Sequence, residues 1–300
     1  MRIVIAGGTG FLGRALAETL AADRHDVTVL TRQSIGGQAR AVMWNPNGDS
    51  GPWAAALDGA DAVVNLAGES IGGRRWTAAQ KQRILDSRLN ATRSIVAAIR
   101  ASRSAPPLLV NASAVGYYGP RGDEIVTETE HPGSDFLATV CAQWEAEAAR
   151  AANDRTRVVC VRTGIVLDKQ GGAMPQMMLP FRLGAGGPVG SGRQYWPWIH
   201  RADWIGMVRW LLLADRASGP FNATGPEPVT NAEFAKALGR AMHRPALLPT
   251  PGFILRVVLG EMADGLLLAG QRAIPQRAEQ AGFVFRYRHL APALEAIFSE

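Results

Sequence analysis

Short apolar runs and amphipathic stretches alternate along the first 225 residues of the chain. Each apolar run is only a few residues long, as is typical of a strand buried on both faces, and the runs lie at 3–6, 27–31, 41–44, 62–66, 108–111, 158–162 and 221–223. Between them, apolar residues recur at helical spacing at 11–20, 77–101, 136–152 and 204–214. This order of strands and helices predicts an α/β fold with a doubly wound parallel sheet and right-handed crossovers.

The regular alternation ends near Lys169. Glycine is frequent between Gly171 and Gly192, among Met and Pro residues, and this composition favours long loops that cover a site over a linker between independent modules. A helix at 231–242 and a mostly helical tail follow. We therefore expect a first domain formed by residues 1–168 and 201–225 and a smaller, discontinuous C-terminal substrate domain formed by 169–200 and 226–300.

The turn after the first strand reads GGTGFLG at residues 7–13. Gly7, Gly10 and Gly13 have separate tasks, because the turn needs a residue that tolerates unusual φ, phosphates need a close approach to the backbone, and the helix must pack tightly on the strand. The N-terminus of that helix presents unpaired N–H groups to a pyrophosphate. Because the turn follows a strand, opens a helix and precedes a second strand, it predicts a Rossmann-type dinucleotide-binding domain.

The residue after the second strand distinguishes NAD from NADP. Where an acidic side chain would bind the ribose 2′-hydroxyl, this chain has Thr31 and Arg32, with Arg14 and Arg40 elsewhere in the same region. The planar fork of an arginine suits a 2′-phosphate by charge and by geometry. The alternative is that Arg32 is an ordinary solvated surface arginine. Its position favours NADP(H) as the cofactor.

Composition narrows the classes of function further. The chain has 300 residues, is 47% hydrophobic and carries a net charge of +6, but Lys81, Lys169 and Lys236 are its only lysines and its arginines are spread along the sequence. This spacing argues against nucleic acid as a partner. Cys141 and Cys160 have no metal-site spacing and are too few for a disulfide framework. With no recognisable signal peptide or membrane span, we expect a cytoplasmic protein with no bound metal and no membrane partner.

In an open α/β sheet the ligand lies beyond the C-terminal ends of the strands. We assign the cofactor site to residues at these ends, together with one arginine of the long helix: Gly7, Thr9, Gly10, Phe11, Leu12, Gly13, Arg32, Leu66, Ala67, Gly68, Arg88, Thr163 and Gly164. Ser113 ends its strand, and Tyr117 and Tyr118 follow at once, so hydroxyl groups converge near the nicotinamide end of the cofactor. Ser113 and Tyr117 are therefore the catalytic candidates. The alternative is that Ser113 caps a turn and that the tyrosines pack a loop.

The second half of the chain is expected to form the substrate pocket. It supplies aromatic faces and positive charge from Arg182, Arg193, Tyr195, Trp196, Trp198 and His200. This mixture suits an anionic or ring-bearing small molecule, and a nucleotide sugar is one candidate. Residues of the loop after the fourth strand would close the other side, so the predicted substrate residues are Glu69, Trp76, Trp198 and His200. The alternative for the aromatic residues is a core between the domains.

Several longer segments resemble the extended short-chain dehydrogenase/reductase superfamily. More closely, the chain resembles the atypical "epimerase family" branch, whose C-terminal piece is a domain of unknown function. The matching segments are GGTGFLG, NLAGESIGGRRWT at 65–77, DSRLNATRS at 86–94, SAVGYYG at 113–119, the Trp144–Glu145 pair, RTGIVLD at 162–168, GSGRQYWPWIH at 190–200, GEMADGLLLAGQR at 260–272 and GFVFRY at 282–287. The resemblance spans nearly the whole chain.

The chain departs from the superfamily at its usual acid/base pair. In working members a Tyr and a Lys four residues apart follow the serine, the Tyr acting as general acid/base and the Lys lowering its pKa and holding the ribose. Counted back from Glu145, these positions are Leu137 and Cys141, or Phe136 and Val140 in the neighbouring register. Neither register supplies a proton donor or a cation. The candidate replacements are Tyr117, Tyr118, Glu69 and His200.

Each candidate has a structural alternative. Glu69 can orient Arg75 or Arg88, His200 can be a structural histidine, and Cys141 is more plausible as a small buried residue than as a nucleophile. Two functions remain open. One is an NADP(H)-dependent oxidoreductase or epimerase that acts on a small molecule with an altered acid/base arrangement. The other is an NADPH-binding regulatory or sensor protein without turnover. The resemblance also implies a homodimer formed through the two long helices.

Overall fold

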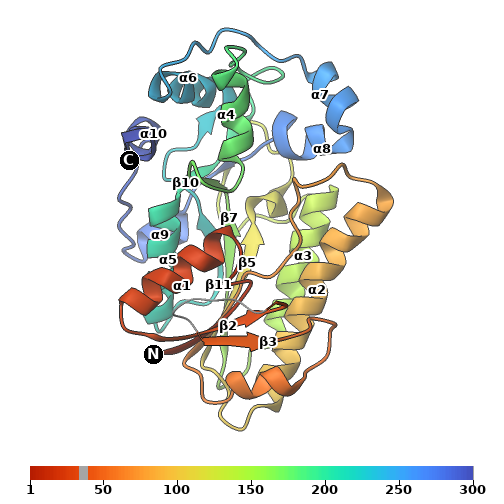
Figure 1. Cartoon of the computed structure of the whole chain (residues 1–300), viewed down its shortest axis with the longest axis vertical. Helices are drawn as coiled ribbons and strands as arrows, with labels where there is room; N and C mark the ends of the chain where they lie inside the picture. Colours follow the sequence, from red (N-terminus) through yellow and green to blue (C-terminus); the bar gives the residue numbers. More distant parts are fainter. Residues whose placement is uncertain (34–39, 300) are drawn as a thin grey trace.

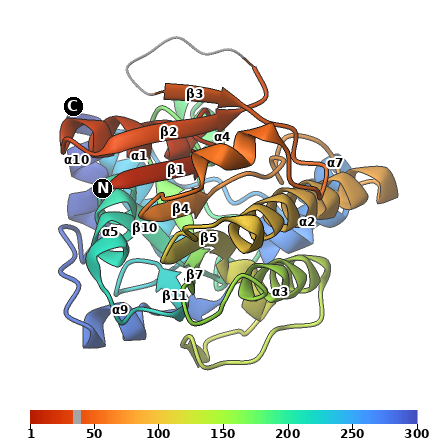
Figure 2. The same cartoon turned by 90° about the horizontal axis from the view of Figure 1, so that it is seen from below.

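A seven-stranded parallel sheet forms the centre of the computed structural model, which describes residues 1–33 and 40–299 (Figures 1 and 2). The strands follow the order β11-β7-β5-β4-β1-β2-β3. Their bounds are β1 (Arg2–Ala6), β2 (Asp26–Thr31), β3 (Arg40–Met43), β4 (Ala62–Asn65), β5 (Leu108–Ala114), β7 (Arg157–Thr163) and β11 (Gly219–Ala223). The predicted α/β class and Rossmann-type parallel sheet are confirmed.

Helices cover both faces of this sheet. α1 (Phe11–Ala22) and α5 (Arg201–Leu213) lie on one face, and α2 (Ala78–Ala101) and α3 (Phe136–Ala149) lie on the other (Figures 1 and 2). Val64 of β4 belongs to the first core and Val63 to the second, because successive side chains of a strand point to opposite faces. Both valines are fully buried, which explains the continuous apolar run in the sequence.

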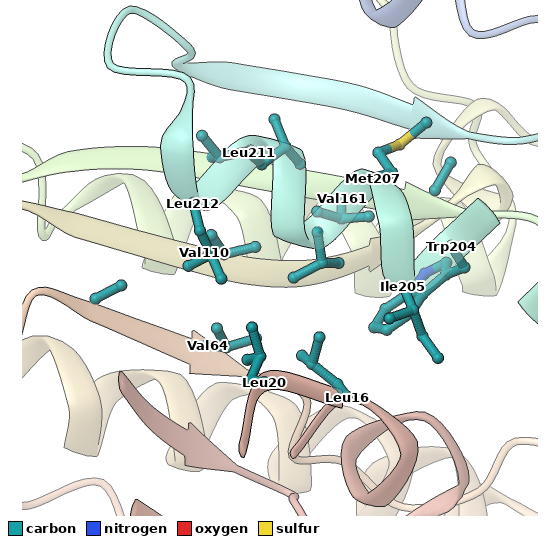
Figure 3. Packing of buried hydrophobic residues seen from close by; sticks show 14 of the residues in the cluster. Leu16, Leu20, Val64, Val110, Val161, Trp204, Ile205, Met207, Leu211 and Leu212 are labelled. Atoms are coloured by element: carbon teal, nitrogen blue, oxygen red, sulfur yellow. The ribbon is translucent and has the colours of Figure 1, made fainter. Parts of the chain in front are cut away.

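The core under α1 and α5 is visible in Figure 3. Leu16 and Leu20 of α1 come from one side, and the residues labelled from Trp204 to Leu212 come from α5. Both sets pack on Val64, Val110 and Val161 of β4, β5 and β7. Burial of this apolar surface holds the two helices on the sheet, and with them the loops that open each helix.

The smaller part of the molecule follows the C-terminal ends of β7 and β11. Its elements are β8 (Ile165–Leu167), α4 (Met174–Arg182), β9 (Tyr195–Trp196), β10 (Trp198–His200), β12 (Val229–Thr230), α6 (Asn231–Ala241), α7 (Gly252–Leu259), α8 (Glu261–Ala263), η3 (Asp264–Leu268) and α10 (Leu290–Ser299). A separate hydrophobic core joins α4, α6 and α10. The helix α4 was not predicted, because its buried Met174, Met178 and Phe181, although spaced as on one helix face, stand among glycines and prolines.

Part of the tail returns to the first domain. β13 (Arg272–Ala273) pairs with β6 (Ile125–Val126), and Ala278 of α9 (Gln276–Gln280) joins the core of the large sheet. Arg277 of the same helix donates a 2.7 Å hydrogen bond to the carbonyl of Pro220 in β11. The expected division assigned 226–300 to the smaller domain and did not include this return, since two-residue strands leave no periodic pattern to read.

Short 3-10 segments complete the fold at η1 (Pro52–Ala56) and η2 (Val115–Tyr118). None of the helices in the described ranges is long and apolar enough to cross a membrane.

Candidate cofactor and active site

The strand order reverses between β1 and β4. From β1 the chain builds β2 and β3 on one side, and from β4 it builds β5, β7 and β11 on the other. Open α/β sheets bind ligands outside the carboxyl ends of the strands at such a reversal. Here the glycine turn follows β1, and Leu66 to Gly68 follow β4. A Cβ on Gly7 would lie 2.7 Å from the carbonyl carbon of Leu66, and the φ of Gly7 is +78°, so only glycine lets the two loops meet.

The other two glycines of the turn differ in what surrounds them. A Cβ on Gly13 would lie 2.2 Å from the carbonyl oxygen of Gly7, so glycine is needed there for α1 to pack against the turn. At Gly10 the same oxygen is the nearest atom, at 3.4 Å, and the residue is exposed. Gly10 is the N-cap of α1, so it stands where the unpaired N–H groups of the helix face outward. This geometry suits a bound pyrophosphate.

Phe11 begins α1 and is covered from the smaller domain. A Cβ on Gly171 would lie 2.2 Å from the ring of Phe11, so the glycine loop after β8 lies directly against the start of the helix. Thr9 is exposed, whereas Leu12 is half-buried. The predicted cofactor residues of this turn therefore lie together, beneath a loop that glycine allows to approach.

Arg32 lies in the turn after β2. Thr31 is buried and shapes this turn, because its Oγ1 donates to the carbonyl of Gln33 at 2.7 Å and accepts from the Gln33 N–H at 3.2 Å. Arg32 itself is exposed, as are Arg14 and Arg40. None of these three arginines has an acidic partner among the residues the structure describes. Arg32 is the one that lies at the carboxyl ends of the strands, because Arg40 begins β3 and pairs with Thr28 inside β2.

The loop after β4 is held by a buried asparagine. Asn65 Nδ2 donates to Asn111 Oδ1 at 2.7 Å, and Asn65 Oδ1 accepts from the N–H of Ala67 at 3.2 Å. Gly68 follows and lies on Arg88 of α2, with Arg88 Cγ 3.2 Å from where a Cβ of Gly68 would be. The predicted cofactor residues Leu66, Ala67, Gly68 and Arg88 therefore form one group. Thr163 ends β7 and Gly164 follows it, and Thr163 Oγ1 accepts a hydrogen bond from Trp204 Nε1 at 3.1 Å.

Ser113 is part of a buried polar network. Its hydroxyl donates to Glu145 Oε1 at 2.6 Å, and the side chain is 3% exposed. Glu145, in α3, forms a two-pronged ion pair with Arg162 of β7, with Nε–Oε1 and Nη2–Oε2 both at 2.8 Å. Burial is the largest single influence and opposes the charge of Arg162, but its hydrogen bonds and charge interactions with Glu145 and Tyr118 together outweigh burial, so the pKa of Arg162 is raised above its ordinary value.

Sequence reasoning did not include Glu145 and Arg162 among the functional residues. A signal was present, because Arg162 directly follows the apolar run VVCV within β7. A charge inside a buried strand needs a partner. The sequence does not show that the partner is Glu145, because the pairing depends on how α3 lies on β5 and β7.

The two tyrosines of η2 have different surroundings. Tyr118 is fully buried, its hydroxyl donating to Asn222 Oδ1 at 2.7 Å and accepting from Arg162 Nη1 at 3.0 Å. Burial raises the pKa of Tyr118 to about 12, so this hydroxyl keeps its proton at neutral pH. Tyr117 is half-buried, with its ring centroid 3.5 Å from Arg162 Cζ, and its hydroxyl makes no hydrogen bond within the described part of the chain. Tyr117 is thus the one whose hydroxyl is available.

The positions of the usual acid/base pair hold packing residues. Leu137 packs against Gly116, with its Cβ 3.3 Å from where a Cβ of Gly116 would be. Cys141 is 4% exposed, and burial raises the pKa of its thiol to about 12, so the thiol stays protonated. This environment favours the structural interpretation of Cys141 over a nucleophilic one.

Glu69 and Trp76 lie near the start of α2. Glu69 Oε1 accepts from Gln80 Nε2 at 2.9 Å and lies 3.7 Å from Arg83 Nε. The expected partners of the Glu69 carboxylate were Arg75 or Arg88. Instead, Arg75 donates to the carbonyl of Val257, and Arg88 donates to the backbone carbonyls of Glu69 and Ile84. The Trp76 indole donates to the carbonyl of Ile71 at 2.8 Å, packs edge-on against Phe136 and touches Gly265 of η3. It therefore joins α3 to the smaller domain.

Trp198 and His200 serve the structure of the smaller domain. Trp198 is 0% exposed, and its Nε1 donates to the carbonyl of Glu227 at 3.0 Å, so the predicted contact with a substrate has no open surface in this geometry. His200 is the N-cap of α5, where its Nδ1 accepts from the N–H of Ala202 at 3.1 Å. Its ring also lies 4.2 Å from that of Tyr287. These contacts favour the structural alternative for both side chains.

The described residues of this region do not form a cluster of metal-ligating side chains. Over residues 1–33 and 40–299, no three His, Cys, Asp or Glu side chains converge in a way that could hold an ion.

Comparison with known proteins gives a consistent result. The model of the NAD dependent epimerase/dehydratase family matches residues 3–224, and that of a domain of unknown function, DUF1731, matches 250–297. Epimerase family protein MT2273 of Mycobacterium tuberculosis is 43% identical over 97% of this chain and 96% of its own length. A crystal structure of human epimerase family protein SDR39U1 with NADPH has a TM-score of 0.92 and 39% identity, covering 100% of this chain and 99% of that one. The nucleoside-diphosphate sugar epimerase from Corynebacterium glutamicum has a TM-score of 0.79 and 32% identity, covering 99% of this chain and 58% of that one.

Proposed function

Because the chain belongs to the NAD-dependent epimerase/dehydratase family, we propose that it binds NADP(H) across the β1/β4 reversal and acts on a small molecule by hydride transfer. One observation carries this proposal. The reversal brings together a glycine turn that leaves room at Gly10, an exposed arginine after β2 and a serine at the end of β5. These are the features that a dinucleotide and a reacting carbon beside it require.

The preference for NADP(H) over NAD(H) rests on Arg32. Its guanidinium is exposed and free of acidic partners in the described ranges, so it can bind a 2′-phosphate without first breaking an ion pair. The human relative SDR39U1 was crystallised with NADPH, which supports the same choice for this chain.

An Arg32→Glu variant is expected to bind NADPH about tenfold to 50-fold more weakly, because charge-assisted hydrogen bonds to the 2′-phosphate are lost and a like charge takes their place. NADH affinity is expected to stay the same or to rise, since a carboxylate accepts hydrogen bonds from a free 2′-hydroxyl. Isothermal titration calorimetry with both cofactors measures this reversal. Unchanged NADPH affinity would refute the role of Arg32.

Ser113 and Tyr117, beside the nicotinamide end of the bound cofactor, have different roles in proton transfer. When bound, NADP(H) supplies or accepts the hydride. The Ser113 hydroxyl donates to Glu145, so its lone pairs remain to accept a hydrogen bond from a substrate hydroxyl and to orient it. Tyr117, whose hydroxyl makes no hydrogen bond to any described residue, is the group that gives or takes the proton, with Arg162 against its ring. Glu145 and Arg162 fix both residues in place.

A Ser113→Ala variant is expected to lose about tenfold in turnover, the value of one orienting hydrogen bond, while its NADPH affinity changes by less than about twofold. A Ser113→Thr variant keeps a hydroxyl and is the matched control, expected to retain more activity than Ser113→Ala. Steady-state kinetics and NADPH titration of the three proteins separate the two effects. If turnover and NADPH affinity fell together, Ser113 would be a structural residue.

For the substrate, a nucleotide sugar is our first candidate. The Corynebacterium glutamicum relative is a nucleoside-diphosphate sugar epimerase, and its 32% identity to this chain extends over 99% of this chain and 58% of that one.

A second function is favoured by a specific observation. Leu137 and Cys141 stand where an acid/base pair is usual, which suits a regulatory or sensor protein that binds NADPH without turnover.

A further inference from the structure

The helix α7 buries none of its eight residues, although most of them are apolar. Its most exposed apolar side chains are between 42% and 74% exposed, and the two leucines just before the helix are exposed as well. We call these six residues the α7 face: Leu247, Leu248, Phe253, Ile254, Val257 and Val258. An apolar surface of this kind indicates a site of interaction, because soluble proteins rarely leave such residues together in water.

The α7 face continues toward the end of α4. The N–H of Leu248 donates to the carbonyl of Gly186 at 3.1 Å, and the N–H of Thr250 donates to that of Pro188 at 2.8 Å. The residues before α7 therefore run beside the loop that follows α4, where Leu183 is also exposed. Figure 1 shows α6, α7 and the segment between them at one end of the molecule.

The chain around the α7 face is basic. Residues 234–260 include no Asp or Glu, and their Lys and Arg residues are Lys236, Arg240, Arg244 and Arg256. The two acids that follow this segment are neutralised, Glu261 by Lys81 at 2.8 Å and Asp264 by Arg256 at 2.9 Å. The segment therefore keeps a positive charge beside its apolar residues.

Four exposed cations at this end have no hydrogen-bond or ion-pair partner for their side chains among the described residues. We call them the free cations: Arg182, Lys236, Arg240 and Arg244. Arg182, Arg240 and Arg244 line one hollow between α6 and α10, and Glu295, which lines it with them, lies beyond ion-pair distance. Lys236, Arg240 and Arg244 line a second hollow together with Leu247 of the α7 face. Cations and exposed apolar side chains are thus neighbours.

The charge of this surface decides what can cover it. Two copies of the chain that met through it would bring like charges together, which opposes self-association. An anionic bilayer has the complementary charge. Its headgroup phosphates bind arginine and lysine side chains, while apolar side chains enter the boundary of the acyl chains. A bilayer also extends far enough to contact α4, α6 and α7 at once.

We propose that the α7 face and the free cations bind the chain to the surface of membranes that contain anionic phospholipids. The expectation of no membrane partner rested on the lack of a spanning stretch in the sequence, and a helix that lies in the interface needs no span. Membrane binding does not require NADP(H), so its failure would leave the proposed function untouched.

The first test is co-sedimentation of the full chain with two kinds of vesicle. One kind is phosphatidylcholine alone, and the other contains equal parts of phosphatidylcholine and phosphatidylglycerol. We expect binding to the mixed vesicles to be at least about tenfold tighter. High salt is expected to remove most of this difference, since it screens exposed charges.

The second test removes the apolar contribution. A variant with Phe253→Ser and Val257→Ser is expected to bind the mixed vesicles about tenfold or more weakly, because two apolar side chains no longer enter the interface. Both residues are exposed, so thermal unfolding of the variant is expected to match that of the parent. Val284→Ser is the matched control, since Val284 is 84% exposed outside the α7 face, and it is expected to bind as the parent does.

The third test removes charge. A variant with Arg240→Gln and Arg244→Gln is expected to bind the mixed vesicles about tenfold more weakly, because each basic residue near an anionic surface contributes to binding. Arg100→Gln with Arg103→Gln removes the same charge near the end of α2 and is expected to change binding by less than about twofold.

Three results would overturn the proposal. They are binding of the parent protein to neither kind of vesicle, equal binding to both kinds, and binding to the mixed vesicles that neither pair of substitutions weakens. A parent protein that ignores vesicles but forms a dimer in sedimentation velocity, lost when Phe253 and Val257 become serine, would show that a second copy covers the α7 face instead.

Discussion

A Gly10→Val variant is expected to bind NADPH at least about 100-fold more weakly than the parent protein and to unfold at the same temperature. The parent residue is exposed, and its conformation, φ −76° and ψ 176°, is open to any L-residue. A Cβ at this position meets only Gly7 O, at 3.4 Å. The valine is therefore expected to change the stability of the protein little. Its side chain instead fills the space in which phosphate oxygens reach the N–H groups of α1. Loss of two charge-assisted hydrogen bonds is worth about 3 kcal/mol or more.

Fluorescence titration with NADPH, together with thermal unfolding of the protein alone, measures both parts of this expectation. Gly13→Ala is the matched variant, because its Cβ would lie 2.2 Å from Gly7 O and must displace backbone. It is expected to lower the unfolding temperature as well as the affinity. NADPH binding that survived in Gly10→Val would show that the turn does not hold the pyrophosphate.

An Arg162→Met variant is expected to lose about 3–5 kcal/mol of unfolding free energy, the usual cost of leaving one partner of a buried ion pair uncompensated. Arg162 is 2% exposed and holds both oxygens of Glu145 at 2.8 Å. It also donates to the Tyr118 hydroxyl at 3.0 Å and lies against the ring of Tyr117. Its removal therefore leaves the Glu145 carboxylate, 13% exposed, with the Ser113 hydroxyl as its one side-chain donor among the described residues.

Urea unfolding measures the loss, and the pair Arg150–Glu147, in which the arginine is exposed and Glu147 also pairs with Arg93, supplies the comparison. Arg150 is 60% exposed in that pair, so Arg150→Met is expected to cost less than about 1 kcal/mol. A double variant in which Met replaces Arg162 and Gln replaces Glu145 is expected to recover part of the stability, since no buried charge is then unpaired. A loss of less than about 1 kcal/mol in Arg162→Met would contradict the account of this network.

Features that depend on neighbouring residues could be predicted from the sequence. The turn from Gly7 to Gly13 is formed by neighbouring residues. A Cβ on Gly7 or Gly13 would collide with backbone atoms, as expected where the spacing calls for glycine. The parallel sheet followed from continuous apolar runs, because strands such as β4 are buried on both faces. The position of Arg32 after β2 is also a local fact of sequence.

Features that depend on distant residues could not be predicted. Ser113 donates to Glu145, 32 residues away, and Tyr118 donates to Asn222, 104 residues away, and no periodicity connects such pairs. Likewise, Trp198 looked like a ligand-facing aromatic residue because only the packing of the smaller domain shows that it is fully buried. The role of His200 could not be predicted either, since its function as an N-cap depends on where α5 begins.

The central claim is that NADP(H) bound at the β1/β4 reversal takes part in a reaction. The most direct test is single-turnover oxidation of NADPH already bound to the protein, followed at the nicotinamide absorbance while nucleotide sugars, aldehydes and ketones are added in turn, with analysis of the sugar products. We predict that one class of compound either oxidises the bound NADPH or is epimerised, and that Ser113→Ala slows this change. Tight binding of NADPH with neither oxidation nor a new product for any class would contradict the claim and support a sensor.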